Sequence, residues 1–240
     1  MFLSRTKNLG AGAALLSVLL LLLTALGACR PAATSPAVPD ATAPFQLIQE
    51  RWSGQPLRVQ PTAPACLFRD LAQAFCSAYT DYPPNVALLR HLSVPGAPLP
   101  DEHSYYVEED TLLSFVRCDM GGQFEYLTAL CHWPRARGHQ LVAVLLQIGH
   151  EGECSDGLLL FYDYDPSTRL MRPDTLLFND VQRLLRRHEG SLVFRLQPEK
   201  RAVRVWGVTW NETDDFLFDA FLLRWDGHTF TEEPLSDPDA

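Results

Sequence analysis

The sequence lacks the short motifs that mark the common families of hydrolase. No GxSxG turn surrounds a nucleophilic serine, no SxxK pair follows residue 28, and no cysteine–histidine pattern matches a thiol protease. Adjacent acidic residues such as Asp214-Asp215 fall at the ends of expected strands, and nothing in the linear sequence brings two carboxylates together as a glycosidase requires. The sequence therefore offers no catalytic residue and indicates no cofactor.

Cysteine pairs at CxxC spacing are also missing, which argues against a thioredoxin-type redox site and against a zinc ribbon. Five cysteines follow Cys29, and an odd number leaves at least one thiol outside any intramolecular disulfide. Cys118 and Cys154 are expected at the same end of a sheet, so a disulfide between them is the structural interpretation. Most of the other cysteines are expected to be buried free thiols, because cysteine packs like a small apolar residue.

Basic charge is scarce as well, and the only lysines are Lys7 and Lys200. Without Arg5 and Lys7 the chain has 18 basic and 29 acidic residues, a net charge of −11. Binding to nucleic acid depends on a basic surface that neutralises phosphates. We therefore expect no nucleic-acid partner.

The first 28 residues have no acidic side chain and contain three regions in a fixed order. Arg5 and Lys7 form a basic start, a long apolar run follows, and small residues precede Cys29. This is the order of a secretory signal peptide. Its last four letters, LGAC ending at Cys29, resemble the lipobox of bacterial lipoproteins. The resemblance implies that residues 1–28 are removed and that Cys29 carries lipid such as palmitate. The alternative is an uncleaved transmembrane anchor, since about 20 apolar residues span a bilayer.

Residues 29–44 are rich in proline, alanine, serine and threonine, which predicts a flexible tether between the lipid and a domain. Arg30 stands where the inner-membrane retention signal of enteric lipoproteins has aspartate. The resemblance therefore implies an outer-membrane protein that faces the periplasm. Residues 45–234 suffice for a single globular domain, and residues 235–240 are expected to be a disordered tail.

The pattern of the mature chain predicts an α+β fold with a mainly antiparallel meander sheet. Apolar residues recur at helical spacing in residues 66–80, which predicts an amphipathic N-terminal helix packed on that sheet. From residue 105 onward, short runs rich in Val, Phe, Tyr and Trp alternate with turn clusters, as is typical of hairpins. LVAVLLQI and GLLLFY are apolar on both faces, so they are expected to be central strands. An all-β sandwich or partly closed barrel is the alternative.

Residues 131–154 hold the densest set of candidate metal ligands. His132 and His139 flank the segment PRARG and would face each other if this segment were a hairpin turn. A following strand at ~3.3 Å per residue would carry the chain about 35 Å away before His150 and Glu151. The sequence therefore gives two separate candidates for a metal site, and polar surface is the simpler interpretation of both.

The segment FYDYDPSTRLMRPD, residues 161–174, has the spacing of an acidic calcium loop. Asp163, Asp165 and Asp174 would take the first, third and twelfth positions of such a loop. Thr168 stands where the loop needs glycine, and the flanks are expected strands rather than helices. A hairpin turn explains the segment better, with Asp165 bonding the backbone and the following proline presetting its φ. We therefore do not expect calcium to bind here.

Taken together, these patterns predict a lipoprotein of the cell envelope that acts as a non-catalytic binding or scaffold module. Its membrane contact is the lipid on Cys29, and its candidate partners are another envelope protein or a glycan. The alternative is an envelope hydrolase, metal-assisted, that uses the His132/His139 pair or the His150/Glu151 region.

Overall fold

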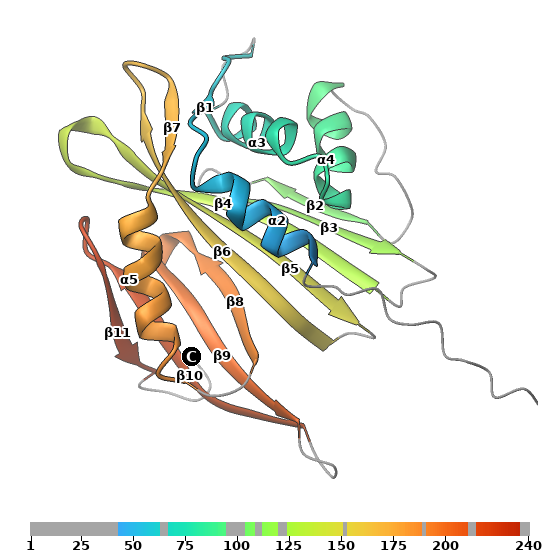
Figure 1. Ribbon diagram of the computed structural model, residues 1–240, viewed down its shortest axis with the longest axis vertical. Helices are drawn as coiled ribbons and strands as arrows, with labels where there is room; N and C mark the ends of the chain where they lie inside the picture. Colours follow the sequence, from blue (N-terminus) through green and yellow to red (C-terminus); the bar gives the residue numbers. More distant parts are fainter. Residues whose placement is uncertain are drawn as a thin grey trace, which may run out of the picture. The chain divides into compact units, whose positions relative to one another are not determined.

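Two antiparallel sheets form the framework of the protein, and helices cover one face of the larger sheet (Figure 1). The computed structural model describes residues 43–62, 67–94, 104–108, 112–119, 124–150, 153–188, 191–210 and 215–235. All of them belong to one unit, Ala41–Ala240. The predicted leader, Cys29 and the tail residues 236–240 lie outside the described residues. Within the described ranges, no helix is both long and apolar enough to cross a bilayer.

The larger sheet has the strand order β1-β7-β6-β5-β4-β3-β2, with antiparallel neighbours throughout. Its strands are β1 (Leu57–Arg58), β2 (Tyr105–Glu108), β3 (Leu112–Asp119), β4 (Phe124–Pro134), β5 (Gln140–His150), β6 (Glu153–Asp165) and β7 (Leu170–Pro173). The smaller sheet has the order β11-β10-β9-β8. Its strands are β8 (Ser191–Gln197), β9 (Ala202–Trp210), β10 (Asp215–Trp225) and β11 (Phe230–Pro234).

The predicted α+β class and its antiparallel meander are confirmed. The meander is divided into two sheets, which the sequence pattern did not indicate. The division falls where helix α5 (Thr175–Leu185) separates β7 from β8. Asp174 caps the N-terminus of α5, since its Oδ1 accepts a 3.0 Å hydrogen bond from the Leu177 N–H.

Helices α2 (Ala43–Trp52), α3 (Leu67–Ala78) and α4 (Pro83–Ser93) cover one face of the larger sheet (Figure 1). Helix α3 is the one predicted for residues 66–80, and it buries Phe68, Leu71 and Phe75. The ring of Phe68 lies 4.8 Å from that of His132 on β4. Thr128 of β4 donates a 3.0 Å hydrogen bond to Asn85 of α4, so these two buried polar side chains satisfy each other.

Strand β5 is central in the larger sheet, and residues 141–149 are all buried. The prediction that LVAVLLQI is covered on both faces is therefore confirmed. Helices cover one face, and the smaller sheet packs on part of the other. Phe230 of β11 makes that second contact, with its ring 5.2 Å from that of Phe161 and 5.9 Å from that of Trp133.

Two hairpins share one turn design. Asp165 pairs with Leu170 around the β6–β7 loop, and Gln197 pairs with Ala202 around the β8–β9 loop. Each loop begins with proline and ends with an arginine in the left-handed region, with φ of 54° for Arg169 and 48° for Arg201. The sequence did not indicate these left-handed arginines, because few non-glycine residues adopt such a φ.

Candidate functional site

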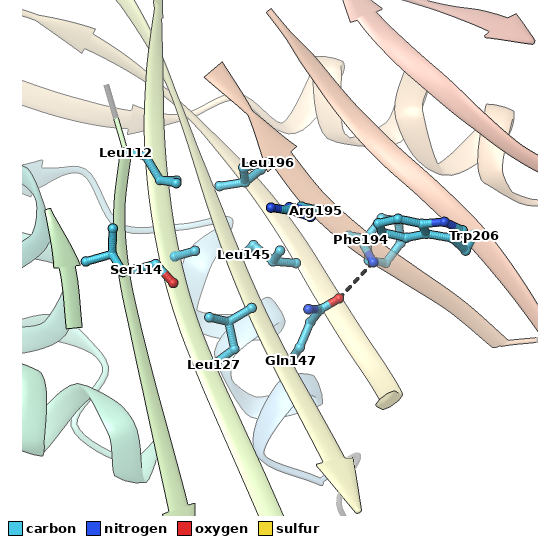
Figure 2. A pocket seen from close by; sticks show the side chains of 11 residues that line it. Leu112, Ser114, Leu127, Leu145, Gln147, Phe194, Arg195, Leu196 and Trp206 are labelled. Atoms are coloured by element: carbon cyan, nitrogen blue, oxygen red, sulfur yellow. Dashed lines mark hydrogen bonds between the residues drawn. The ribbon is translucent and has the colours of Figure 1, made fainter. Parts of the chain in front are cut away.

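An open groove of about 460 Å³ lies between the larger sheet and the β8 edge of the smaller sheet (Figure 2). This volume lies within the ~300–1,000 Å³ range of small-molecule pockets. The groove occupies the face of β3, β4 and β5 that the helices do not cover. It is the best candidate for a binding site in the part of the chain that the structure describes.

The floor of the groove is mainly apolar. Strand β4 contributes Leu127 and Ala129, and their partners across the ladder on β5 are Gln147 and Leu145. Ser114 of β3 pairs with Ala129 and continues the same face. Paired residues on adjacent strands point to the same side of a sheet, which explains why these residues form one surface.

The walls of the groove come from strands at the sheet edges. Phe194 and Leu196 of β8 form one wall, beside Trp206 of β9. Val107 of β2 lies on the opposite side and is 44% exposed. An apolar residue exposed beside an apolar floor leaves surface that a ligand can remove from water.

Two contacts bring β8 close to the larger sheet. The backbone N–H of Phe194 donates a 2.8 Å hydrogen bond to Oε1 of Gln147, a buried side chain of the groove floor (Figure 2). Phe194 also lies over Gly157 of β6, where a Cβ atom would stand only 2.9 Å from the Phe194 ring. Glycine at this position therefore permits the close approach of the two sheets.

Among the described residues that line the groove, one side chain is charged, and it is basic. Arg195 of β8 is exposed and pairs across the ladder with Arg204 of β9. The Arg204 guanidinium lies over the Trp206 ring, 4.8 Å from its centroid. The groove thus combines an apolar floor with a cation at its wall.

The floor is anchored from the helix side by Tyr82. Its buried hydroxyl lies 2.7 Å from the backbone oxygen of Gln147 and 3.1 Å from that of Leu127. Both of these residues belong to the groove floor. The helices therefore support the strands beneath the groove at the positions that line it.

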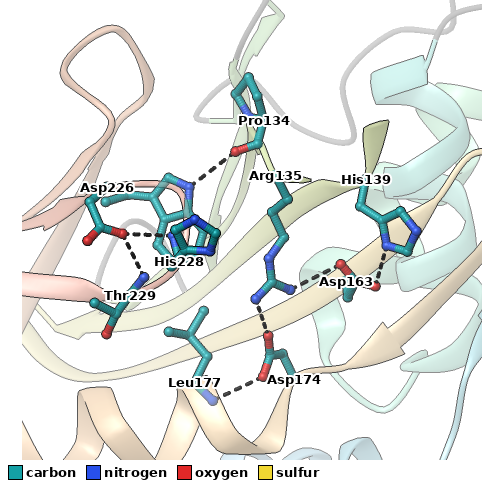
Figure 3. A network of polar contacts seen from close by, with 10 residues as sticks. Pro134, Arg135, His139, Asp163, Asp174, Leu177, Asp226, His228 and Thr229 are labelled. Carbon is teal, nitrogen blue, oxygen red and sulfur yellow. Dashed lines mark hydrogen bonds and ion pairs between the residues drawn. The ribbon is translucent and has the colours of Figure 1, made fainter. Parts of the chain in front are cut away.

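A polar network at the other end of β4 and β6 explains the acidic residues of the predicted calcium segment (Figure 3). Arg135 forms ion pairs with Asp163 at 3.1 Å and with Asp174 at 2.8 Å. His139 Nδ1 lies 2.8 Å from the other oxygen of Asp163. The Arg135 guanidinium also lies 5.5 Å from the centroid of the Trp225 ring. The network joins the β4–β5 hairpin to β6, to the start of α5 and to the smaller sheet.

The three aspartates of the calcium pattern already have partners within the protein. Asp165 lies in the turn, where its side chain accepts hydrogen bonds from Ser167 N at 2.9 Å and from the Thr168 hydroxyl at 2.8 Å. Asp163 and Asp174 belong to the network of Arg135. The structure therefore supports the hairpin-turn interpretation of this segment.

The two histidines near PRARG do not face each other, contrary to the sequence interpretation. His132 pairs with Val142 across the ladder, and its Nδ1 lies 3.3 Å from Gln140 Oε1. Burial lowers the pKa of His132. His139 instead lies after β4 and contacts Asp163. The turn occupies Arg135 to His139, so the ladder places His132 beside a different residue.

The strand order contradicts the predicted disulfide between Cys118 and Cys154. Cys118 lies on β3 and Cys154 on β6, and β4 and β5 run between them. Three strand spacings of ~4.8 Å separate these backbones by about 14 Å, and a disulfide needs Cα atoms within about 7 Å. The sequence correctly placed both residues at one end of the sheet but could not give the strand order.

The second candidate metal site consists of His150 and Glu151. Glu151 and the side chain of His150 lie outside the described residues. Among the residues that are described, no group of three or more His, Cys, Asp or Glu side chains is placed to hold a metal ion. Cys76 and Cys131 are buried free thiols, as the sequence predicts for most cysteines, and burial raises the pKa of both.

The groove itself was missed in the sequence. Its signals were Gln147, a polar residue within an otherwise apolar strand, and Gly157 at the start of the next one. In the sequence, neither residue by itself indicates a binding site. They are connected in the structure because Phe194 of β8 contacts both of them. No family model, no curated protein and no solved structure matches the chain.

Proposed function

We propose that the protein is a lipid-anchored binding module of the bacterial cell envelope, and that it binds an apolar small molecule in the groove beside β8. The groove floor of Leu127, Ala129 and Leu145 carries this proposal. These residues line the groove on the face of the sheet that the helices do not cover, and Val107 beside them is exposed. The lipobox resemblance at Cys29 supports the anchor and the envelope location, with the outer membrane as the expected site.

The edge of β8 favours a small molecule over an added peptide strand. A peptide that extends a sheet needs the outward-pointing backbone groups of the edge strand. The Phe194 N–H, midway along this edge, is already bonded to Gln147. A peptide strand would have to break that buried bond, whereas an apolar molecule on the floor leaves it intact.

The alternative of a metal-assisted hydrolase has less support. Of its two candidate sites, the first needs His132 and His139 to act together, and these residues contact Gln140 and Asp163 respectively. The second, the His150/Glu151 region, lies outside the described side chains. A scaffold role, with an envelope protein or glycan bound elsewhere on the surface, is compatible with ligand binding in the groove.

Photo-crosslinking in cells tests the proposal on the full-length protein. A photoreactive amino acid at Leu127 faces the groove and should form an adduct with a small apolar molecule. Mass spectrometry of the purified protein should detect that added mass. The same amino acid at Leu176, which is 78% exposed on α5, is the matched control. A protein-sized adduct at Leu127, or equal adducts at both positions, would contradict the proposal.

A further inference from the structure

We infer that the ligand of the groove is an amphiphile with a long apolar chain and an anionic head, and that the Arg195 guanidinium binds the head. The inference rests on the proposed function, because it names the class of ligand for the same groove. Four features of the described residues lead to it: the lining, the state of Arg195, the position of Arg204 and the charge of the chain.

The residues that line the groove form an apolar floor and a charged wall. Leu127, Ala129 and Leu145 offer hydrocarbon along the floor, and the polar groups there are few. Gln147 is one of them, and its side-chain oxygen is occupied by the Phe194 N–H. Among the described lining residues, Arg195 at the wall is the charged one. A hydrocarbon chain on this floor leaves water, while its head reaches the guanidinium.

Arg195 is available to a ligand. Its side chain is exposed, and the structure gives its guanidinium no ion pair or hydrogen bond within the described part of the chain. An arginine fork binds a carboxylate or a phosphate through two parallel hydrogen bonds. Arg195 thus offers a strong site for an anionic head at the point where the apolar floor meets the edge of the smaller sheet.

The neighbour of Arg195 strengthens the preference for an anion. Arg195 and Arg204 are directly opposite in the β8–β9 ladder, and like charges in this position repel. Arg204 is held over the Trp206 ring. A bound anion beside Arg195 would offset the positive charge at this point of the ladder, whereas a neutral or cationic head would not.

The charge of the whole chain makes this local arrangement selective. The sequence is acidic, with a net charge of −9, so most of its surface repels anions. An anionic head therefore gains binding energy at Arg195 specifically. A neutral molecule with the same chain gains only the apolar contacts.

Photoaffinity labelling with matched probes tests the inference. The probes are a long-chain fatty acid and the alcohol of the same length, each with a diazirine at mid-chain. The full-length acylated protein is placed in nanodiscs of phosphatidylcholine, and labelled peptides of β4, β5 and β8 are measured by mass spectrometry. The acid should label these peptides about tenfold more than the alcohol, the effect of one charge-assisted pair.

Arg195→Gln should lower labelling by the acid to the level of the alcohol. Arg186→Gln, at an exposed arginine after α5 that does not line the groove, is the control and should change neither probe. Equal labelling of wild type by acid and alcohol would overturn the inference, as would an unchanged acid preference in Arg195→Gln. A phosphatidylglycerol probe distinguishes the source of the head. Arg195-dependent labelling that is stronger with this probe than with the acid would assign a phospholipid, and labelling that is stronger with the free acid would assign a fatty acid.

Variants with a larger side chain in the groove test the proposed function separately from the anionic head. Ala129→Phe should abolish labelling by both probes, and Ser114→Leu serves the same purpose if the first variant does not fold. If filling abolishes labelling while acid and alcohol label wild type equally, the groove binds apolar molecules and the anionic head is wrong. If a folded filling variant labels like wild type, the proposed function fails as well.

Discussion

The side-chain oxygen of Gln147 accepts a 2.8 Å hydrogen bond from the backbone N–H of Phe194, and this bond joins the groove floor on β5 to the edge strand of the smaller sheet. Both partners are buried. A buried donor that loses its acceptor costs more than the bond itself contributes, because it has no water to replace the lost partner.

Gln147→Ala should therefore loosen β8 from the larger sheet. We expect the free energy of unfolding to fall by about 1–3 kcal/mol, as for an unsatisfied buried group. Urea denaturation measures the loss, and hydrogen exchange should report faster exchange at the Phe194 N–H. Gln49→Ala, at an exposed position of α2, is the control and should change neither quantity. Unaltered protection at Phe194 would show that the bond does not hold β8.

Gly157→Ala should disturb the same junction by crowding. The added Cβ would lie 2.9 Å from the Phe194 ring, so the ring or β8 must move. Overpacking of this kind costs about 1–3 kcal/mol. Gly54→Ala is the matched control, because nothing lies within 4 Å of its added Cβ. Thermal unfolding should show a lower Tm only for Gly157→Ala, and Phe194→Leu in the same chain should recover part of it.

Arg135→Met should destabilise the network that links the β4–β5 hairpin to α5. The substitution keeps most of the aliphatic part of the side chain but removes the guanidinium, which leaves Asp163 and Asp174 without this cation. These side chains are 27% and 15% exposed, so we expect a loss of about 2 kcal/mol, less than for a fully buried pair.

The control for Arg135→Met is Arg183→Met. Arg183 is 74% exposed and pairs with Asp180 on the surface of α5. Surface pairs of this kind contribute about 0.5 kcal/mol. Chemical denaturation of the two variants in parallel measures the loss in free energy of unfolding. Equal losses in both variants would mean that the Arg135 network contributes no more than a surface pair.

Asp165→Ala should change how stability depends on pH. Hydrogen bonds from the side chains and backbone of Ser167 and Thr168 hold the pKa of Asp165 below its usual range. A carboxyl with a lowered pKa stabilises the fold above its unfolded pKa of ~3.9 and loses that contribution as the pH falls toward its folded pKa.

The expected result is a stability difference between wild type and Asp165→Ala that is present at pH 7 and shrinks below about pH 4. Denaturation curves from pH 7 to pH 2 measure it. Asp180→Ala, at a carboxyl on the surface of α5, provides the comparison. A difference that stayed constant with pH would mean that the Asp165 charge is not what stabilises the turn.

Cys29→Ala should prevent acylation and release the protein from the membrane fraction, because the lipid is its proposed anchor. Incorporation of labelled palmitate and fractionation of the envelope measure the two effects. Cys76→Ala removes a buried thiol and should leave acylation unchanged. A membrane fraction that is the same in Cys29→Ala and wild type would refute the lipid anchor.

Much of the fold could be predicted because its signals are local. The expected strands LVAVLLQI and GLLLFY lie in β5 and β6, and the expected helix at 66–80 corresponds to α3. Helix α2 and the short strands β1 and β2 were missed. Strand β1 has only two residues, too few for an alternating pattern, and it forms because Leu57 and Arg58 pair with Met171 and Leu170 of β7.

The candidate site could not be predicted in the same way. Its floor residues were recognised only as members of apolar strands, since apolar residues on both faces of a strand indicate cover but not what provides it. Arg195 had no distinguishing neighbours in the sequence. Its importance comes from the groove beside it and from Arg204 across the ladder.

The sequence by itself determined the turns of this protein, because a turn depends on residues that are neighbours in the chain. Asp165 and its proline specify the β6–β7 hairpin whatever surrounds them. Only the tertiary structure decided that the meander separates into two sheets and that β8 stands over the face of β4 and β5 opposite the helices. That arrangement depends on Gln147 and Gly157 meeting Phe194, residues far apart in the chain whose contact no local pattern records.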